Sequence, residues 1–396
     1  MKRFPIAALR RLVPRPSVWT ALRALASVVA IVRIAGAARR RPPLGGADAD
    51  AAASVAAMVG ADVEQPTISV VVPARDEAAR LGPLLDALSE APGVTEVLVV
   101  DDESTDDTAK VAVDAGAVVV PGTQLPHGWA GKAWALHQGV RAARGEWVVT
   151  LDADTRPDPR LPQALVNRAL ADGLQFVSVG GSFDCPTPGA AWLHPAMLTT
   201  LLYRLGPPDV VGRAAPDQQL ANGQCTTFPR VPFLRAGGMQ PVAGEVVEDV
   251  ALVRHLARRG WKVAMLDGAE LLTTEMYPDG PSTFRGWARS LALPGVDPLW
   301  RQLVDLGVVL LAQVLPLPRL LSRRRDVIDV VMVAVRLGTL AGTRRAYRSA
   351  NGAYWLSPLA DGVAAAALVR GIVMPRQPWR GRSYARPSRS AGRSAS

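Results

Sequence analysis

The hydrophobic pattern begins with a mainly apolar stretch from Val18 to Ala38, broken only by Arg23 and Arg33. Charges inside the apolar part argue against a signal peptide, so we expect residues 1–40 to form a basic membrane anchor or interfacial helix. The next part, residues 41–65, is rich in Arg, Pro, Gly, Ala and Asp, which predicts a linker.

Between residues 66 and 298, short β-branched runs alternate with segments of helical spacing. The runs are Ile68–Val72, Val97–Val100, Ala117–Val120 and Trp147–Leu151, and the helical segments are Ala78–Ser89, Thr108–Ala115 and Lys132–Arg144. Strands that are apolar throughout and alternate with helices predict an α/β domain, with a mostly parallel sheet covered on both faces. Ligands of such sheets bind beyond the carboxyl ends of the strands.

After residue 298 the chain becomes apolar again. The segments Leu303–Leu321, Val327–Gly342 and Trp355–Pro375 each contain an acidic and a basic residue, so none is a clean span of ~20 uncharged residues. Basic residues flank all three, and the positive-inside rule would be broken on one side if all three crossed a bilayer. We expect membrane-associated helices over 299–382, spanning or interfacial, and a disordered basic tail over 383–396.

Composition and charge narrow the possible functions. The chain has 396 residues, 49% of them hydrophobic, and its two cysteines exclude a disulfide-built secreted scaffold. Its net charge of +10 is uneven, because residues 1–65 carry ten Lys and Arg against four Asp and Glu, residues 301–396 carry sixteen against four, and the middle carries nineteen against twenty-seven. Basic ends around an acidic centre disfavour a nucleic-acid partner and fit a chain held against anionic lipid.

Acidic residues follow three of the predicted strands, in the sequences ISVVVPARDE, VLVVDDESTDDT and WVVTLDADT. One such Asp is ordinarily a helix cap or turn former, and Ser104 and Asp107 are candidates for that role. Three acidic strand ends at one edge of a sheet repel one another unless a ligand or cation needs them. Asp152 and Asp154 are the most specific pair, because carboxylates two residues apart can hold a hard cation that also binds diphosphate oxygens.

Together these motifs resemble glycosyltransferase family 2, the inverting enzymes with the Rossmann-like GT-A fold of nucleotide-diphospho-sugar transferases. VVVPARDEAARL is similar to the first nucleotide-binding motif of the family, VVDDESTDDT to its DDxSxDxT motif, LDADT to its DxD motif, and Glu248–Asp249 to its ED motif. Their order and spacing agree over residues 67–275. The resemblance implies a GT-A catalytic domain over 66–298, with membrane-associated helices on both sides.

The resemblance also implies roles for matching residues. Nucleotide-sugar-binding residues would be Pro73, Ala74, Arg75, Glu77, Asp101, Asp102, Lys132 and Asp152, while Asp154, assisted by Asp152, would bind Mg²⁺ or Mn²⁺. Asp249 would be the base that deprotonates the acceptor hydroxyl, with Glu248 as the fallback, and direct displacement at an anomeric carbon does need a base opposite the leaving group. The acceptor side would include Gly223, Gln224, Trp287 and Arg289.

Two features indicate a subgroup. The QxxRW motif of processive polysaccharide synthases is absent, and residues 282–291 read STFRGWARSL, so a long polymer product is not expected. PHGWAGKAWALHQG, residues 126–139, is not a Walker A motif. It is similar to a stretch of membrane glycosyltransferases associated with hopanoid and carotenoid gene sets, in which Lys132 would meet the diphosphate; the alternative is an ordinary helix-surface charge.

The sequence therefore predicts a membrane-bound, metal-dependent glycosyltransferase that moves one sugar from a nucleotide-sugar to a lipid acceptor of isoprenoid type, with inversion. One alternative is a nucleotidyltransferase, which needs a Gly-rich basic loop after the first strand that PARDEAARL does not provide. Another is an inactive nucleotide-sugar-binding membrane scaffold, which the intact acidic motifs disfavour. We expect the chain at the cell membrane, with its catalytic domain facing the cytoplasm, where nucleotide-sugars are made.

Overall fold

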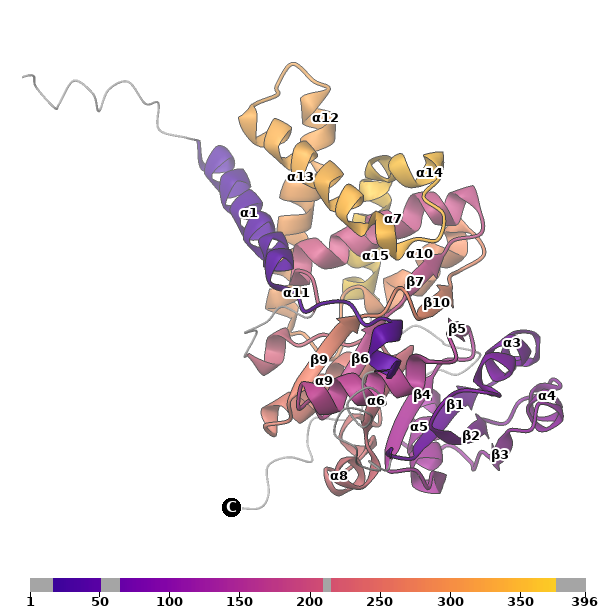
Figure 1. The fold of residues 1–396 in the computed structure, drawn as a ribbon. Helices are drawn as coiled ribbons and strands as arrows, with labels where there is room; N and C mark the ends of the chain where they lie inside the picture. The colour runs from indigo at the N-terminus through magenta and orange to yellow at the C-terminus, as the bar shows by residue number, and fades with distance from the viewer. Residues whose placement is uncertain (1–16, 51–64, 209–214, 375–396) are drawn as a thin grey trace, which may run out of the picture.

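The computed structural model describes residues 17–50, 65–208 and 215–374, whose fold is shown in Figure 1. A seven-stranded sheet has the order β3-β2-β1-β4-β8-β6-β9, and β8 runs antiparallel to β4 and β6 while the other pairs are parallel. A smaller sheet has the order β5-β10-β7. The strands are β1 (Ile68–Ala74), β2 (Val94–Asp101), β3 (Val118–Pro121), β4 (Trp147–Leu151), β5 (Thr155–Pro157), β6 (Phe176–Gly180), β7 (Ser182–Asp184), β8 (Cys225–Pro229), β9 (Val263–Asp267) and β10 (Leu272–Glu275).

Helices cover both faces of the large sheet, as the continuous apolar strands predict. They are α3 (Ala78–Leu88), α4 (Thr108–Asp114) and α6 (Leu161–Ala171) on one face and α5 (Gly131–Ala142), α8 (Arg230–Arg235) and α9 (Glu248–Arg258) on the other. Alternate residues of β1 supply the two cores, because Val70 and Val72 pack with the first group and Val71 with the second. This is the α/β architecture that the sequence predicts, and the four predicted strands and three predicted helices are confirmed.

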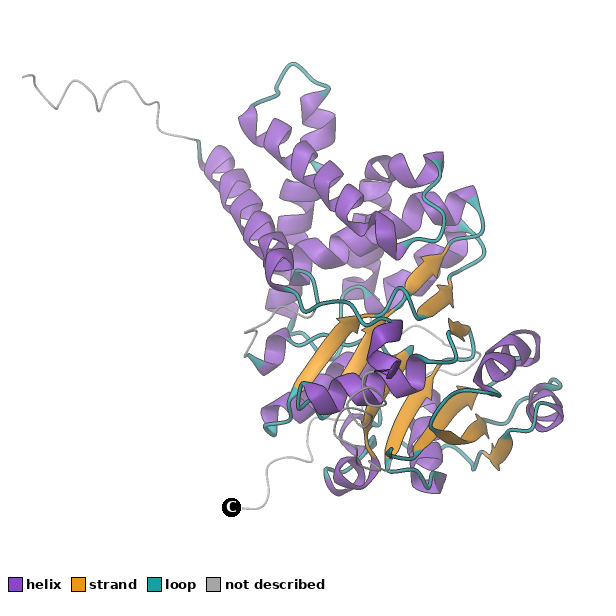
Figure 2. Ribbon diagram, in the orientation of Figure 1, coloured by secondary structure: helices purple, strands orange, loops and turns teal. Residues whose placement is uncertain are grey.

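A separate layer of helices lies beyond the sheets (Figure 2). It consists of α1 (Val18–Ala35), α7 (Pro188–Leu205), α10 (Gly280–Ser290), α11 (Leu299–Val309), the π-helical η5 (Leu310–Val314), α12 (Pro316–Leu320), α13 (Val327–Thr343), α14 (Gly352–Trp355) and α15 (Asp361–Val373). The N-terminal helix thus joins the C-terminal helices in one core, together with α7 and α10 from the middle of the sequence. The described residues also contain short 3₁₀ helices. One of them, η2 (Gly36–Arg39), follows α1, and the others are η3 (Pro216–Gln218), η4 (Gln240–Val242), η6 (Arg344–Ala346) and η7 (Ser357–Ala360).

The charges that interrupt the apolar segments pair with one another inside this layer. Arg23 of α1 binds Asp326 at 2.6 Å and also Asp329, and Arg33 of α1 binds Asp305 at 2.8 Å.

Between α13 and α15, the guanidinium of Arg336 binds the Asp361 carboxylate at 3.0 Å, and Gln313 donates to the same carboxylate at 2.9 Å. The helices therefore hide most of their charges from their outer faces, which are apolar.

Two helical stretches, Val18–Arg39 and Leu299–Leu320, are long and apolar enough to cross a membrane by length and composition alone.

The expected linker differs from the structure where it is described. Leu44 is fully buried and its amide donates to the carbonyl of Asp267 at 2.7 Å, while Asp48 forms an ion pair with Arg168 of α6 at 2.8 Å. Residues 41–50 therefore dock on the sheet domain, because one buried leucine and one charged pair suffice to fix a polar, Gly-rich segment. The rest of the predicted linker, and the predicted disordered tail, lie outside the described residues.

We predict that Asp361→Ala destabilises the chain by about 3–5 kcal/mol, because it leaves Arg336 buried without its partner. The double variant Arg336→Leu/Asp361→Leu should recover most of this loss, since apolar residues need no partner there. Thermal and denaturant unfolding of the detergent-solubilised chain would measure both effects. Lys110→Ala breaks an exposed pair with Asp114 and is the matched control, with an expected cost of about 0.5 kcal/mol or less. An Asp361→Ala variant as stable as this control would contradict the prediction.

Candidate active site

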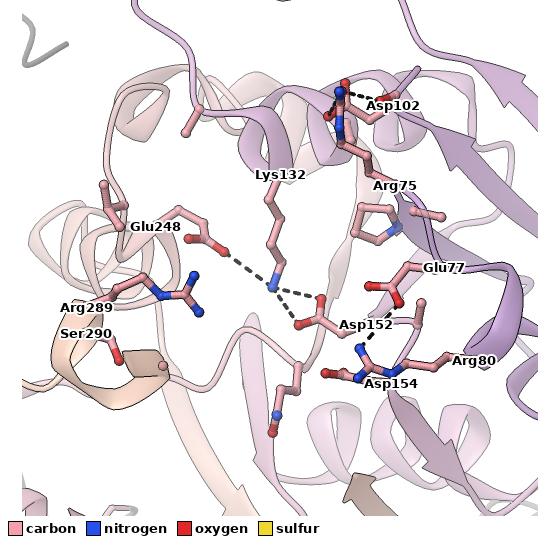
Figure 3. A pocket seen from close by; sticks show the side chains of 18 of the residues that line it. Arg75, Glu77, Arg80, Asp102, Lys132, Asp152, Asp154, Glu248, Arg289 and Ser290 are labelled. Atoms are coloured by element: carbon pink, nitrogen blue, oxygen red, sulfur yellow. Dashed lines mark hydrogen bonds and ion pairs between the residues drawn. The ribbon is translucent and has the colours of Figure 1, made fainter. Parts of the chain in front are cut away.

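A cavity of about 470 Å³ lies beyond the carboxyl ends of β1, β2 and β4. Of the predicted site residues, Pro73, Ala74, Arg75, Glu77, Asp102, Lys132, Asp152, Asp154, Gln224, Glu248 and Arg289 line it. These residues are far apart in sequence, and the sheet brings them together because parallel strands end at the same edge. Figure 3 shows their side chains around one space, with Lys132 between the two sides.

Four predicted site residues do not line this cavity. Asp101 ends β2 and its carboxylate accepts from the amide of Ser104 at 3.1 Å, so it shapes a turn. Trp287 of α10 points away into the helical layer, where its ring contacts His194 at 5.3 Å between centroids. Gly223 and Asp249 line a small inner space instead, which Glu248 lines as well. Adjacent residues of a strand end or helix point in different directions, which spacing in the sequence does not resolve.

The loops after β1 and β2 hold each other in place. The amide of Asp76 donates to the Ser104 hydroxyl at 3.1 Å, and the amide of Thr105 donates back to Asp76 at 2.7 Å. Asp106 accepts from the amide of Ala78 at the start of α3, and its bond with the Thr108 hydroxyl helps to keep its pKa below the usual range. The amide of Thr108, the first residue of α4, also donates to Asp106 at 3.0 Å. Asp106, and not Asp107 as the sequence suggests, therefore caps this helix with its side chain.

On the nucleotide side of the cavity, Arg75 fixes the end of β2. Its guanidinium donates to the carbonyl of Asp102 at 2.8 Å and lies 3.8 Å from the carboxylate of the same residue. The Asp102 side chain is nearly buried and faces the cavity. A buried carboxylate of this kind can accept an N–H group of a ligand, provided that the ligand fills the space in front of it.

Lys132, in the first turn of α5, joins the two halves of the site. Its ammonium lies 2.8 Å from Asp152, 3.4 Å from Glu248 and 3.2 Å from the carbonyl oxygen of Gly223. Burial alone would lower the pKa of Lys132, but the carboxylates of Asp152 and Glu248 raise it above its ordinary value. This lysine is therefore charged and bound in the site, which excludes the alternative of an ordinary helix-surface charge.

Asp154 is the carboxylate that fits a cation. Its Oδ1 atom is buried without a hydrogen-bond partner, and burial together with the nearby charge of Asp152 raises its pKa to about 6. A cation would satisfy this oxygen and remove the repulsion, whereas Asp152 is already neutralised by Lys132. Among the described residues, no group of three or more acidic, His or Cys side chains could hold a metal ion. Asp154 would therefore share the ion with oxygens of a ligand, as divalent cations do beside phosphates.

The two acids at the start of α9 occupy different surroundings. Burial, opposed by Lys132, raises the pKa of Glu248 to about 7, and its side chain faces the cavity. Burial also raises the pKa of Asp249, whose carboxylate accepts from the amides of Gly223 and Val250, both at 2.8 Å. The N-terminus of the helix stabilises the charged form of both.

Some cavity residues were missed by the sequence analysis. Arg80 of α3 forms an ion pair with Glu77 at 3.6 Å, and Figure 3 shows it beside Asp154. Its spacing could have indicated Arg80, because it follows the motif acid Glu77 by three residues and therefore lies on the same helix face. Tyr277 and Ser290 also line the wall. No signal pointed to Tyr277, which is placed by its packing against Gly286, where a Cβ atom would lie 2.0 Å from the tyrosine ring.

Part of the chain is similar to known proteins. Residues 69–221 match the family model of Glycosyl transferase family 2. The 4,4'-diaponeurosporenoate glycosyltransferase of Staphylococcus haemolyticus is 26% identical over 233 residues, which cover 57% of this chain and 61% of the relative. The enzyme of the same name from Staphylococcus aureus strain USA300 is 26% identical over 242 residues, which cover 57% of this chain and 60% of its own. The matched region thus spans about three fifths of the length of these relatives.

Among solved structures, the mannosyltransferase PcManGT from Pyrobaculum calidifontis, in complex with GDP-Man and Mn²⁺, has a similar fold. The TM-score is 0.50 at 17% sequence identity, and the match covers 89% of this chain and 98% of that one. The fold is therefore that of a GT-A domain. The family match covers residues 69–221 and agrees with the resemblance seen in the motifs.

We predict that Asp154→Asn stabilises the ligand-free chain at pH 8 by about 1–2 kcal/mol, because the folded state then holds no repelled carboxylate. A carboxyl whose pKa rises from 3.8 to about 6 on folding destabilises the folded state above pH 6 and has no such effect below pH 4. The gain should therefore vanish at pH 4, and thermal unfolding in EDTA at both pH values would measure it. A less stable Asn variant at pH 8 would contradict the account of this site.

Proposed function

We propose that the protein transfers a single sugar from a nucleotide-sugar donor to a lipid acceptor of isoprenoid type, with inversion, at the membrane. The observation that supports this proposal is that Asp154 and Glu248 line one cavity on opposite sides of Lys132. Asp154 would hold the cation, and Asp249, with Glu248 as the fallback, would be the base. The relatives named 4,4'-diaponeurosporenoate glycosyltransferase support the lipid acceptor.

The donor would lie along the ends of β1 and β2. Arg75 and Asp102 would hold the nucleotide, as their position beside Pro73 and Ala74 allows. Its diphosphate would lie between Asp154 and Lys132, where a cationic side chain is already fixed. A divalent cation, which fits the unsatisfied Asp154 oxygen, would supply charge neutralisation for the departing diphosphate.

The acceptor would enter from the side of α9 and α10. Glu248 lies there, and Figure 3 shows Arg289 directed into the same part of the cavity, without a hydrogen bond or ion pair to the other residues drawn. Gln224 completes this wall, held by the Thr274 hydroxyl at 3.1 Å. During transfer an acceptor hydroxyl would give its proton to a carboxylate of the Glu248–Asp249 pair, its oxygen would bond to the anomeric carbon, and the bond to the diphosphate would break with its electrons.

The membrane side of the proposal depends on the outer surface of the helical layer. Large apolar side chains with exposed fractions of 62–79%, among them Val18, Leu25, Val32, Leu321 and Val327, lie on α1 and around the turn between α12 and α13. An apolar surface of this extent on helices whose internal charges pair with one another is suited to lipid. Because α10 both lines the cavity and packs in this layer, a lipid-borne acceptor would reach the site along it. The cytoplasmic face remains our expectation for the catalytic domain.

We predict that the purified full chain transfers labelled sugar from a nucleotide-sugar to isoprenoid lipid extracts when Mn²⁺ is present, and that EDTA abolishes transfer. Asp154→Ala should remove Mn²⁺-dependent binding of nucleoside diphosphate, because the cation bridges carboxylate and phosphate. Calorimetry would measure binding, with Asp114→Asn on the surface of α4 as the matched control. Equal affinity with and without EDTA would refute the metal-dependent site, and absence of transfer from a panel of donors would refute the function.

We predict that the full chain stays in the membrane pellet at 1 M salt and at alkaline pH, because apolar burial is insensitive to screening that shortens the Debye length to ~3 Å. Glu substitutions at Leu22, Leu25 and Val32 on the exposed face of α1 should increase its release, whereas Leu170→Glu, an exposed leucine of the sheet domain, should not. Fractionation with immunoblotting measures this. Recovery of the unaltered chain in the salt wash would leave only electrostatic attachment.

A further inference from the structure

One face of α10 forms a wall of the cavity. The helix contributes Gly286, Arg289 and Ser290 to this wall, and the last two follow Gly286 by three and four positions, so all three lie on the same helix face. Trp287 and Ala288, which lie between them in sequence, pack in the helical layer instead. The cavity face of α10 therefore carries no side chain at position 286.

The ring of Tyr277 fills the gap at Gly286. A Cβ atom on Gly286 would lie 2.0 Å from Cζ, 2.2 Å from the hydroxyl oxygen and 2.4 Å from Cε2 of Tyr277, which is closer than real Cβ atoms come to other atoms. The outer half of the ring therefore rests directly on the backbone of α10. Both residues line the cavity, so a ring that is pushed off the helix moves into that space.

The backbone on both sides of Tyr277 is held in place. The amide of Glu275, at the end of β10, donates to the carbonyl of Asp154 at 3.2 Å. Asp279, two residues after Tyr277, caps α10 by accepting from the amide of Ser282 at 2.6 Å. A change at position 286 is therefore met by the side chain of Tyr277 and not by a shift of its loop.

This wall is separate from the part of the cavity that would hold the nucleotide. Figure 3 shows Arg289 and Ser290 on one side of Lys132, and Arg75 and Asp102 on the other. A substitution on the cavity face of α10 can therefore change the space for an acceptor while the contacts of the nucleotide stay as they are.

We propose that Tyr277 determines which acceptors the cavity admits, and that the missing side chain at position 286 keeps its ring out of the acceptor's path. The inference rests on the proposed function, because it concerns the acceptor of the same site. A tyrosine ring offers a flat apolar surface with a polar tip. This surface suits the end of an isoprenoid alcohol, where branched hydrocarbon lies next to the reacting hydroxyl.

The first test is a double-mutant cycle on the detergent-solubilised full chain. Gly286→Ala should push the ring into the cavity and raise the apparent KM for isoprenoid lipid extract by about tenfold or more, because one added carbon in a pocket changes discrimination by about 10–200-fold. In Gly286→Ala/Tyr277→Ala the obstructing ring is gone, so the KM should return to that of Tyr277→Ala. Initial rates of labelled-sugar transfer at saturating donor measure the KM, and calorimetry with Mn²⁺ and UDP or GDP should show the same affinity in every variant.

Gly307→Ala in α11 is the matched control, because it also adds a methyl group to a helical glycine but meets no atom within 4 Å. Its acceptor KM should equal that of the unaltered chain. A double variant whose KM stays as high as in Gly286→Ala would overturn the proposal, since the obstruction would then not be the Tyr277 ring. Weaker nucleotide binding in Gly286→Ala would overturn it as well, because the change would then reach beyond the acceptor side.

Tyr277→Ala tests the specificity directly and does not depend on the folding of Gly286→Ala. Loss of the ring widens the acceptor side, so the ratio of kcat/KM for a fused-ring alcohol, cholesterol, to that for a linear isoprenoid alcohol, geranylgeraniol, should rise by about tenfold. Tyr277→Phe keeps the ring and should leave the ratio unchanged. An unchanged ratio in Tyr277→Ala would refute the role of Tyr277, whereas absence of any transfer by the unaltered chain would refute the proposed function itself.

Discussion

The site depends on one buried ammonium group. Lys132 contacts an acid from the end of β4 and an acid from the first turn of α9, two elements that otherwise repel each other across the cavity. Without this cation, the partly buried carboxylates of Asp152, Asp154 and Glu248 would share one cavity without a compensating charge. The same contact decides which carboxylate remains for a metal, because it neutralises Asp152 and leaves Asp154 unsatisfied.

The sheet edge supplies the frame in which this lysine acts. β1, β2 and β4 are adjacent and parallel, so their ends present acidic loops side by side. The loops after β1 and β2 are tied by reciprocal bonds between Asp76 and the segment that contains Ser104 and Thr105. Part of the acidic motif therefore builds the loops, and only Asp102 of its residues faces the cavity. The motif after β2 thus contains acids that hold the loops, such as Asp101 and Asp106, next to Asp102, which faces the cavity.

The helical layer pairs the charged residues that interrupt its apolar segments. Its apolar segments carry acids and bases that would be costly in contact with lipid, and most of these meet across helix interfaces, as Arg23 meets Asp326 and Arg336 meets Asp361. The outer faces are left apolar. Since α10 belongs to this layer and also to the cavity wall, the helical layer and the cavity share an element.

The sequence by itself determined the alternation of strands and helices, because continuous apolar strands and helical spacing are local properties of the chain. It also determined the acidic strand ends, and with them the class of enzyme, since parallel strands must bring such ends to one edge. Only the tertiary structure decided which of these acids face the cavity, because side-chain direction at a strand end or helix start depends on what packs behind it. Asp101, Trp287 and Asp249 turn away for that reason, whereas Arg80 and Tyr277 enter the wall. The pairing of α1 with helices some three hundred residues later was equally unreadable, because the attraction between opposite charges depends on their separation in space and not along the chain.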